Sequence, residues 1–439
     1  MADVKQERGS TYIVKERNIP LFGRNELTRR LEPVFKYDFL FFLSYGIFLI
    51  SSILSASFYY KLFVGRPYMW IQILCVVLLV GYEFRNGGIR NQDWKGFAVA
   101  AAMFLIAFRV SHASVHRQSV LMLAYIYCAR RIPFAKIARF TLNVSVVLAC
   151  TIVLSGYLGI IDNIAAVKSG RVREYLGFRY ALYLPGLLLN MTALWIYLRK
   201  EKITVPGALV WAVVNWAVYY KTDSRISFVI AQALLAAALV MRFWPKIVEK
   251  LKPLWWLAVS SFGVCGAFSL VMTIGYDNSI SWMRKLNSIL ESRLRLGSRS
   301  LTEHGVTLFG QEIEWLGNGL DAFGNSVSGI YTYVDCMYIK ILQRYGIVFT
   351  IALAVLLCWA MYRLYKRKEY HILLICASVA VHCVLDDLSF TLHYNTFWIA
   401  MGLVLLCPSM LNWDGRTTGI LLPKDANTKL NGKTVQTEE

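Results

Sequence analysis

Two polar segments interrupt the apolar runs of this sequence, and they carry the side chains best suited to bind a substrate or to act on it. The segments span residues 162–179 and 276–336, and both contain clustered arginines. The guanidinium group of arginine presents a planar fork of donors that matches two oxygens of a phosphate group. With Arg225 from a short segment between them, the arginines suggest a site for a pyrophosphate, built from Arg171, Arg173, Arg225, Arg293, Arg295 and Arg299.

The elements that must position these arginines are long apolar helices. The chain has 439 residues, of which 57% are hydrophobic and only 17% are charged, whereas a soluble protein has about a quarter charged. A helix needs about 20 apolar residues to cross a bilayer, because its backbone groups must be satisfied internally. We predict an all-α, polytopic membrane helix bundle with spans near 39–62, 68–84, 95–111, 118–129, 140–161, 180–198, 204–221, 226–244, 254–275, 337–362, 370–386 and 390–410.

The placement of basic residues predicts the orientation of this bundle. Eight Lys and Arg residues precede the first predicted span, and basic residues favour the cytoplasmic side. We therefore expect a multi-pass protein of the cell membrane with both termini in the cytoplasm. Residues 1–38 form a cytoplasmic segment, residues 39–410 form the transmembrane catalytic domain with both polar segments on its outer face, and residues 411–439 form a disordered cytoplasmic tail.

The net charge of +20 follows from this topology and does not indicate a nucleic-acid partner, because the basic residues lie in the gaps between apolar runs. Arginines near a membrane also bind lipid headgroups without specificity, or pair with carboxylates, here Glu174, Glu291 and Glu303. For the whole set we favour a binding site, because basic residues on the outer side oppose the usual orientation. Nine cysteines without a CxxC pair predict neither a metal site nor a disulfide framework, and we expect no cofactor.

The larger polar segment is predicted to be partly helical. Asn278 or Ser279 is a suitable N-cap residue for a helix. Apolar residues then recur at helical spacing, at Met283, Leu286, Leu290 and Leu294. This apolar stripe predicts a helix that lies along the membrane interface with its arginines toward water.

Short stretches in both polar segments resemble Wzy-type polysaccharide polymerases of the O-antigen polymerase and ligase group, in particular the capsule and exopolysaccharide polymerases of Gram-positive bacteria. Residues 170–178 (GRVREYLGF) are similar to an arginine-containing loop of that family, and Arg299 with Gly310 fits an arginine, ten residues, glycine pattern. The first loop departs from this pattern, because Leu182 and Leu184 stand eleven residues after Arg171 and Arg173. Further similar stretches are 222–228, 286–297, 306–311, and Asp335 with Tyr338 and Tyr345-Gly346.

The resemblance implies a membrane glycosyltransferase that extends a glycan on undecaprenyl pyrophosphate without a metal ion. The growing chain would be transferred to a new lipid-linked repeat unit, and membrane lipids, a flippase and a chain-length regulator would be its partners. Arg293, Arg295 and Arg299 would bind the donor pyrophosphate. Arg171, Arg173 and Arg225 would bind the acceptor pyrophosphate or form a wall of the same site.

The acceptor hydroxyl would also have to lose a proton, and the second segment offers His304, Glu303, Glu312 and Asp335 as bases. His304 has a suitable ordinary pKa, although it is equally explained as a solvated loop histidine. Asp335 would either act as the base or pair with an arginine and order the site. We name Arg293, His304 and Asp335 as candidate catalytic residues.

Two other functions fit parts of the pattern. A ligase of the O-antigen type would transfer a finished chain to a different acceptor and would use the same arginine chemistry. A transporter or flippase of lipid-linked sugars would show internal repeats and charges at mid-membrane, whereas here the unusual residues lie in the polar segments.

Overall fold

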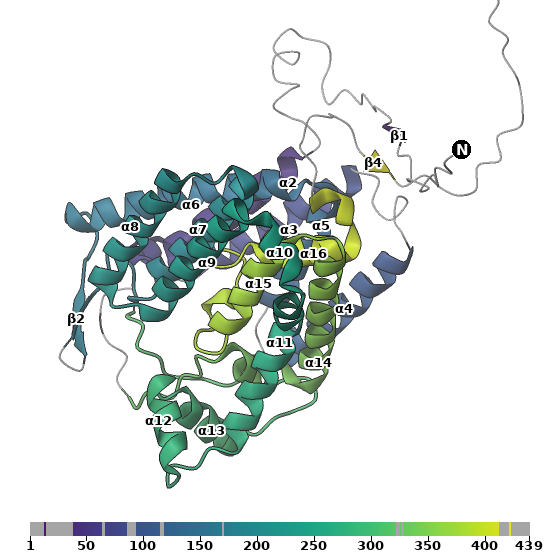
Figure 1. The fold of residues 1–439 in the computed structure, drawn as a ribbon. Coiled ribbons are helices and arrows are strands. Elements are labelled where there is room, and N and C mark those ends of the chain that lie inside the picture. Colours follow the sequence, from purple (N-terminus) through teal and green to yellow (C-terminus); the bar gives the residue numbers. More distant parts are fainter. Residues whose placement is uncertain are drawn as a thin grey trace, which may run out of the picture.

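The computed structural model describes residues 13–14, 38–63, 66–85, 94–114, 118–168, 171–321, 325, 329–411 and 421–422. In these residues the chain forms a helical bundle (Figure 1). The predicted cytoplasmic segments 1–38 and 411–439 lie almost entirely outside this part of the chain. The α-helices are α2 (Phe39–Ser55), α3 (Arg66–Arg85), α4 (Trp94–Ser114), α5 (Gln118–Cys128), α6 (Phe134–Tyr157), α7 (Tyr183–Arg199), α8 (Val205–Thr222), α9 (Arg225–Phe243), α10 (Pro245–Lys250), α11 (Lys252–Ile274), α12 (Ser281–Ile289), α13 (Arg293–His304), α14 (Met337–Lys366), α15 (Tyr370–His382) and α16 (Phe397–Leu406).

Short elements connect these helices. The 3₁₀ turns are η1 (Phe58–Leu62), η3 (Ala129–Arg131), η4 (Lys200–Lys202), η5 (Leu388–Phe390) and η6 (Pro408–Leu411). Two antiparallel strand pairs complete the described fold: β1 (Ile13–Val14) with β4 (Leu421–Leu422), and β2 (Ala165–Lys168) with β3 (Arg171–Glu174). In Figure 1 the β1–β4 pair lies on the opposite side of the bundle from α12 and α13.

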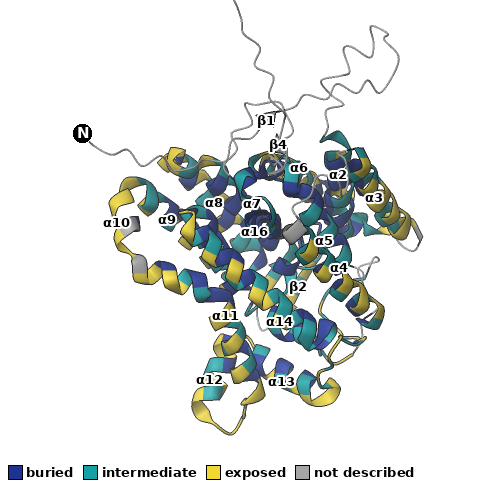
Figure 2. Cartoon of the chain, turned by 90° about the vertical axis from the view of Figure 1, so that its right-hand side faces the viewer, coloured by how far each residue is buried: buried dark blue, intermediate teal, exposed yellow. Residues whose placement is uncertain are grey.

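Within the described ranges, six helices are long and apolar enough to cross a membrane: Pro67–Arg85, Phe97–Ser114, Phe134–Tyr157, Arg225–Phe243, Pro253–Ile274 and Met337–Lys366. Their outward faces expose large apolar side chains, such as Val77 and Phe84 on α3 and Val271 on α11. Figure 2 shows this exposed surface along the outer helices. So much apolar surface is stable when lipid is the solvent, and the fold is that of an all-α membrane bundle.

The predicted spans each contain a helix, but several of these helices are shorter than predicted. Helices α2, α15 and α16 are apolar but have only 17, 13 and 10 residues, and α5 has 11. The prediction for residues 370–386 was wrong at its end, because α15 stops at His382. The chain then runs without α-helix to Thr396 and carries two adjacent aspartates.

Helix α14 is the central element of the half of the bundle that carries the outer segment. It packs against α4, α11, α15 and α16. At Gly346 its backbone leaves the helical region, with φ of 82°. The amides of Ile347 and Val348 donate to the carbonyls of Thr307 and Leu308 at 3.1 Å each. A Cβ at Gly346 would lie 2.6 Å from the Leu308 carbonyl oxygen, so glycine permits the close approach that holds the outer segment on the bundle.

The outer segment contains two helices, which corrects the prediction of one continuous stripe from Met283 to Leu294. Helix α12 ends at Ile289, and Glu291 and Ser292 then adopt positive φ values of 50° and 68°. Helix α13 follows, packs on α11, and projects with α12 from one end of the bundle (Figures 1 and 2). Asn278 and Ser279 do not cap α12, which begins two residues after Ser279.

The first polar segment, residues 162–179, forms a β-hairpin that was not predicted from the sequence. Strands β2 and β3 pair in the register Ala166 with Arg173. The chain then turns at Gly177, whose φ is 81°, and a Cβ there would lie 2.8 Å from the Ile152 carbonyl oxygen of α6. This close contact fixes the hairpin against the bundle and leads the chain into α7.

Candidate functional site

A cavity of about 340 Å³ lies where three segments of the chain meet, and we call it the loop cavity. Its volume is in the range of small-molecule sites. The walls come from residues 179–183 before α7, from residues 315–321 and 331–335 of the outer segment, and from residues 386–388 after α15. Five aromatic side chains line it: Tyr180, Tyr183, Trp315, Tyr331 and Tyr333.

Asp335 lies in the cavity wall and is paired with Arg293. The Arg293 Nη2 and Asp335 Oδ2 atoms are 3.4 Å apart, and the two side chains are only 13% and 10% exposed. The Tyr331 hydroxyl donates to the same carboxylate at 2.7 Å. Burial raises the pKa of Asp335, while the positive charge of Arg293 opposes that rise. Burial, and then the charge of Asp335, also raise the pKa of Tyr331, which therefore remains a donor.

The position of Asp335 follows from how α14 begins. Asp335 directly precedes the N-cap residue Cys336, where the positive end of the helix dipole favours a carboxylate. The Met337 amide donates to the Cys383 carbonyl at 2.9 Å, and Arg293 Nε donates to the Leu385 carbonyl at 3.1 Å. These bonds bring the start of α14, the start of α13 and the loop after α15 together.

Asp387 enters the same cavity with a different cation. Lys340 of α14 donates to the Asp387 carboxylate and to the Tyr333 hydroxyl, and that hydroxyl donates to Asp387 at 3.0 Å. The Lys340 ammonium also lies 4.2 Å from the centre of the Tyr333 ring. Asp387 and Tyr333 are thus held by one lysine at the cavity wall.

Asp321 and Asp386 are the other two carboxylates of the cavity. Asp321 accepts hydrogen bonds from Asn325, whereas Asp386 has no ion pair with any residue that the structure describes. Asp386 is 9% exposed, and its Oδ1 accepts the Leu388 amide at 2.8 Å. Burial raises the pKa of Asp386, and the negative charge of Asp387 raises it further.

A second group of charged residues joins the hairpin to the end of α8, and we call Arg173, Glu174, Lys221, Asp223 and Arg225 the hairpin cluster. Arg173 and Arg225 approach the two oxygens of Asp223 at 3.5 and 3.4 Å, and Lys221 binds Glu174 at 2.9 Å. Asp223 ends α8 in the left-handed conformation, with φ of 48°. Arg171 lies on β3, but its side chain is outside the described residues.

Tyr180 lies between the two regions. It lines the loop cavity, and its ring centre is 6.4 Å from that of Tyr175, which follows the hairpin. Burial raises its pKa, as do the charges of Asp335 and Asp386, while Arg293 and Arg173 lower it. The fields of both arginines therefore reach one side chain of the cavity.

The arginines of α13 do not point to one place. Arg293 turns into the cavity wall, whereas Arg295 and Arg299 are exposed, because residues two apart on a helix face nearly opposite sides. Arg299 pairs with Glu303 at 2.6 Å. His304 is exposed at the end of α13 and does not line the loop cavity. Of the candidate catalytic residues, the structure brings only Arg293 and Asp335 together.

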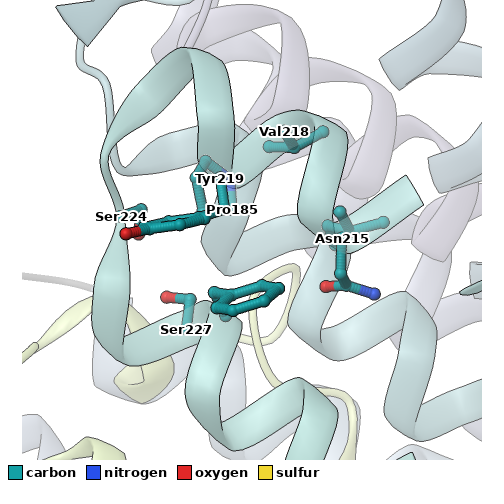
Figure 3. A pocket seen from close by; sticks show the side chains of 8 residues that line it. Pro185, Asn215, Val218, Tyr219, Ser224 and Ser227 are labelled. Carbon is teal, nitrogen blue, oxygen red and sulfur yellow. The ribbon is translucent and has the colours of Figure 1, made fainter. Parts of the chain in front are cut away.

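A much smaller cavity of about 10 Å³ lies between α7, α8 and α9, and Figure 3 shows the side chains around it. Tyr219 and Phe228 stack there with ring centres 4.6 Å apart. The space is enough for about one water molecule, so it does not compete with the loop cavity as a substrate site.

No protein-family model, no curated protein and no solved structure matches this chain. Among the described residues, no group of three His, Cys, Asp or Glu side chains is arranged to hold a metal ion.

Lys340, Asp386 and Asp387 were not among the predicted site residues, although Asp386 and Asp387, near the last predicted outer turn, were considered either for the floor of a cavity or as polar residues at a helix end. All lie in or beside predicted spans, where a charged side chain signals function or a local end of the helix. The adjacent aspartates at the end of the predicted span 370–386 were the available signal, since two carboxylates are unusual beside an apolar run.

Proposed function

We propose that this chain is a polysaccharide polymerase that joins oligosaccharide repeat units carried on undecaprenyl pyrophosphate, as the resemblance to Wzy-type polymerases implies. In this reaction the first sugar of the growing chain leaves its lipid pyrophosphate and is joined to a hydroxyl of a new repeat unit. The enzyme would need a site for sugars, cations for pyrophosphate, and access from the membrane.

The proposal rests on one observation: a single cavity combines aromatic rings, carboxylates and an arginine in its wall. Aromatic rings offer flat apolar faces that suit the C–H faces of sugar rings, and Tyr180, Trp315 and Tyr333 lie in the wall. Carboxylates accept hydrogen bonds from sugar hydroxyls. Arg293 reaches the same wall through its ion pair with Asp335.

The cations would act on the leaving group. Negative charge develops on pyrophosphate as the sugar bond breaks, and fixed donors aimed at that charge stabilise the transition state. Arg293 is suited to the donor pyrophosphate because it is largely buried and held by backbone carbonyls. Arg173 and Arg225 of the hairpin cluster are suited to the acceptor pyrophosphate. Arginines in these positions would do the work of a metal ion.

The proposal also includes the finer topology. About twelve membrane crossings, with both termini in the cytoplasm, place residues 162–179 and 276–336 on the outer face of the cell membrane. The shorter helices α5, α15 and α16 would then cross together with the connecting segments that flank them. A lipid-linked glycan delivered to the outer leaflet would reach the loop cavity from the membrane.

Deletion of the gene in its host, followed by analysis of lipid-linked glycans, tests the proposal. A polymerase mutant accumulates single repeat units on the lipid carrier at the outer face, and the wild-type gene restores long chains. Long polymer that stays on the carrier would indicate a ligase. Repeat units confined to the inner face would indicate a flippase, and unchanged surface polymer would contradict all three functions.

A further inference from the structure

Four carboxylates line the loop cavity. Asp321 accepts hydrogen bonds from the amide and the side chain of Asn325, and of the other three carboxylates two have a cationic partner. Asp335 is held by Arg293 and accepts from Tyr331, and Asp387 is held by Lys340 and accepts from Tyr333. Asp386 accepts one backbone amide and, among the described residues, forms no ion pair. Of these three carboxylates, Asp386 is therefore the one that forms no ion pair within the described part of the chain.

We propose that Asp386 is the catalytic base of the loop cavity, which takes the proton from the acceptor sugar hydroxyl. The assignment rests on the proposed function, since it requires an acceptor hydroxyl in the cavity. It replaces His304, which lies at the exposed end of α13.

The proposed step is balanced without an added reactant. The acceptor oxygen forms a bond to the anomeric carbon of the growing chain. The bond from that carbon to the lipid pyrophosphate breaks, and its electron pair leaves with the pyrophosphate. The hydroxyl proton passes to a carboxylate oxygen of Asp386 and is later released to water. Arg293 stabilises the charge on the departing group.

The partners of Asp335 and Asp387 make them poorer bases. A carboxylate that is paired with a cation and accepts a hydroxyl proton is stabilised in its charged form and binds an added proton less readily. Asp335 and Asp387 both have this arrangement. They are better suited to fix Tyr331 and Tyr333, and with them the sugar-binding wall.

The charges around Asp386 predict how activity depends on pH. A base acts when it has lost its proton. Because burial and the charge of Asp387 raise the pKa of Asp386, activity falls with decreasing pH at values above the ordinary carboxyl range, about 4. The charged and titratable groups around it come from its own loop and from every neighbouring element. They are Asp387 and Cys383 near it in the sequence, Asp335 and Lys340 at the start of α14, Arg293 of α13, Asp321, Tyr331 and Tyr333 of the outer segment, Arg179, Tyr180 and Tyr183 at the start of α7, and Tyr394 before α16.

Asp277 provides a matched control. Its Oδ1 accepts the amide of Ser279, two residues later, at 2.8 Å, as Asp386 accepts the amide of Leu388. Asp277 is exposed and does not line the cavity. An Asp277→Asn change therefore alters the same local backbone bond without altering the proposed base.

The test measures chain growth by the full-length protein in lipid vesicles with a synthetic lipid-linked repeat unit. We expect Asp386→Asn to lower turnover by about 100-fold or more while the half-saturating substrate concentration changes by less than about threefold. Asp277→Asn should keep wild-type turnover. Asp386→Glu should retain part of the activity and shift the acidic limb of the pH profile.

The outcomes separate the two proposals. If the wild-type protein does not extend the substrate, the proposed function fails. If it does, and Asp386→Asn keeps more than about a third of its turnover, Asp386 is not the base. If Asp386→Asn does not fold, Asp386→Glu decides, because an unchanged acidic limb in that variant would overturn the assignment.

Discussion

The loop cavity and the hairpin cluster lie on either side of Tyr180, and their charges are balanced in opposite ways. The cavity is lined by four carboxylates in a wall rich in aromatic rings, and three cations oppose them: Arg179 in the lining, Arg293 beside Asp335 and Lys340 beside Asp387. The hairpin cluster holds Arg173, Lys221 and Arg225 against Asp223 and Glu174. One region has an excess of carboxylate, and the other has an excess of cation.

This difference suggests a division of labour. An acidic, aromatic wall suits hydroxyl-bearing sugars, whereas excess guanidinium suits phosphate oxygens. Two arginines belong to the acidic wall: Arg179, which donates to backbone carbonyls, and Arg293, which is paired with Asp335. Under the proposed function, Arg293 is the arginine assigned to the leaving pyrophosphate. If the two regions have separate roles, substitutions in the cavity should lower turnover, and substitutions in the hairpin cluster should weaken substrate binding.

The largest expected effect follows from removing Arg293, the arginine that pairs with Asp335 in the cavity wall. Arg293→Ala should lower chain growth by about 100-fold or more, because it removes a fixed donor for the leaving group. The change also leaves Asp335 buried without its cation, so the amount of folded protein must be measured beside activity. Arg293→Lys, which keeps the charge, should recover part of the rate.

The exposed arginines of α13 provide the contrast for this experiment. Arg295→Ala and Arg299→Ala should each lower turnover by less than about tenfold, because a lost exposed contact is worth about 1 kcal/mol or less. A loss as large as that of Arg293→Ala would show that the exposed face of α13 also belongs to the site.

An intermediate effect is expected in the hairpin cluster. Arg173→Ala should raise the half-saturating concentration of the lipid-linked repeat unit by about tenfold, the loss expected for one charge-assisted hydrogen bond. Turnover at saturation should change little, because Arg173 would hold the acceptor and not the leaving group. Steady-state kinetics over a range of substrate concentrations separates the two.

Lys61→Ala is a suitable control for this variant. Lys61 pairs with Asp162 at 3.0 Å, but both side chains are nearly half exposed, and such surface pairs contribute little. If Lys61→Ala and Arg173→Ala have equal effects, the hairpin cluster has no special role. If Arg173→Ala lowers only turnover, the cluster acts on the reaction and the proposed division is wrong.

The smallest expected effect concerns stability. Because the pKa of Asp386 is raised in the folded protein, its contribution to stability is greatest below the pKa of the unfolded chain. That contribution is lost as the pH rises through the folded value. Above the folded pKa, the buried carboxylate of Asp386 is charged and costs free energy. Asp386→Asn removes this cost, because the amide carries no charge, and should raise the melting temperature by a few degrees in that pH range. A melting temperature that falls in this pH range would show that the carboxylate is stabilised in the fold.

The sequence was most informative about the bundle and least informative about side-chain direction. Apolar length predicted helices in all the expected spans, because lipid allows little else. Spacing alone could not show that α12 and α13 are separate helices, since the break rests on the positive φ values of Glu291 and Ser292. That break places Arg293 at the start of α13, toward Asp335, and Arg295 toward solvent.

The carboxylates of the cavity show why the arrangement of the site could not be predicted from the sequence. Asp386 and Asp387 follow α15 and Asp335 precedes α14, and the bond from the Met337 amide to the Cys383 carbonyl joins the two segments. That bond joins residues far apart in the sequence. Arg293 and Asp335 were both named from the sequence, but their pairing depends on the same tertiary contact.

The central claim is that this chain joins lipid-linked repeat units in the loop cavity, and one measurement tests it most directly. The purified protein is placed in lipid vesicles with a chelator and a single synthetic repeat unit on undecaprenyl pyrophosphate, and the products are weighed by mass spectrometry. We predict a ladder of products that differ by one repeat unit, together with free lipid pyrophosphate. Substrate that remains a single unit, under conditions where the protein is folded, would contradict the account.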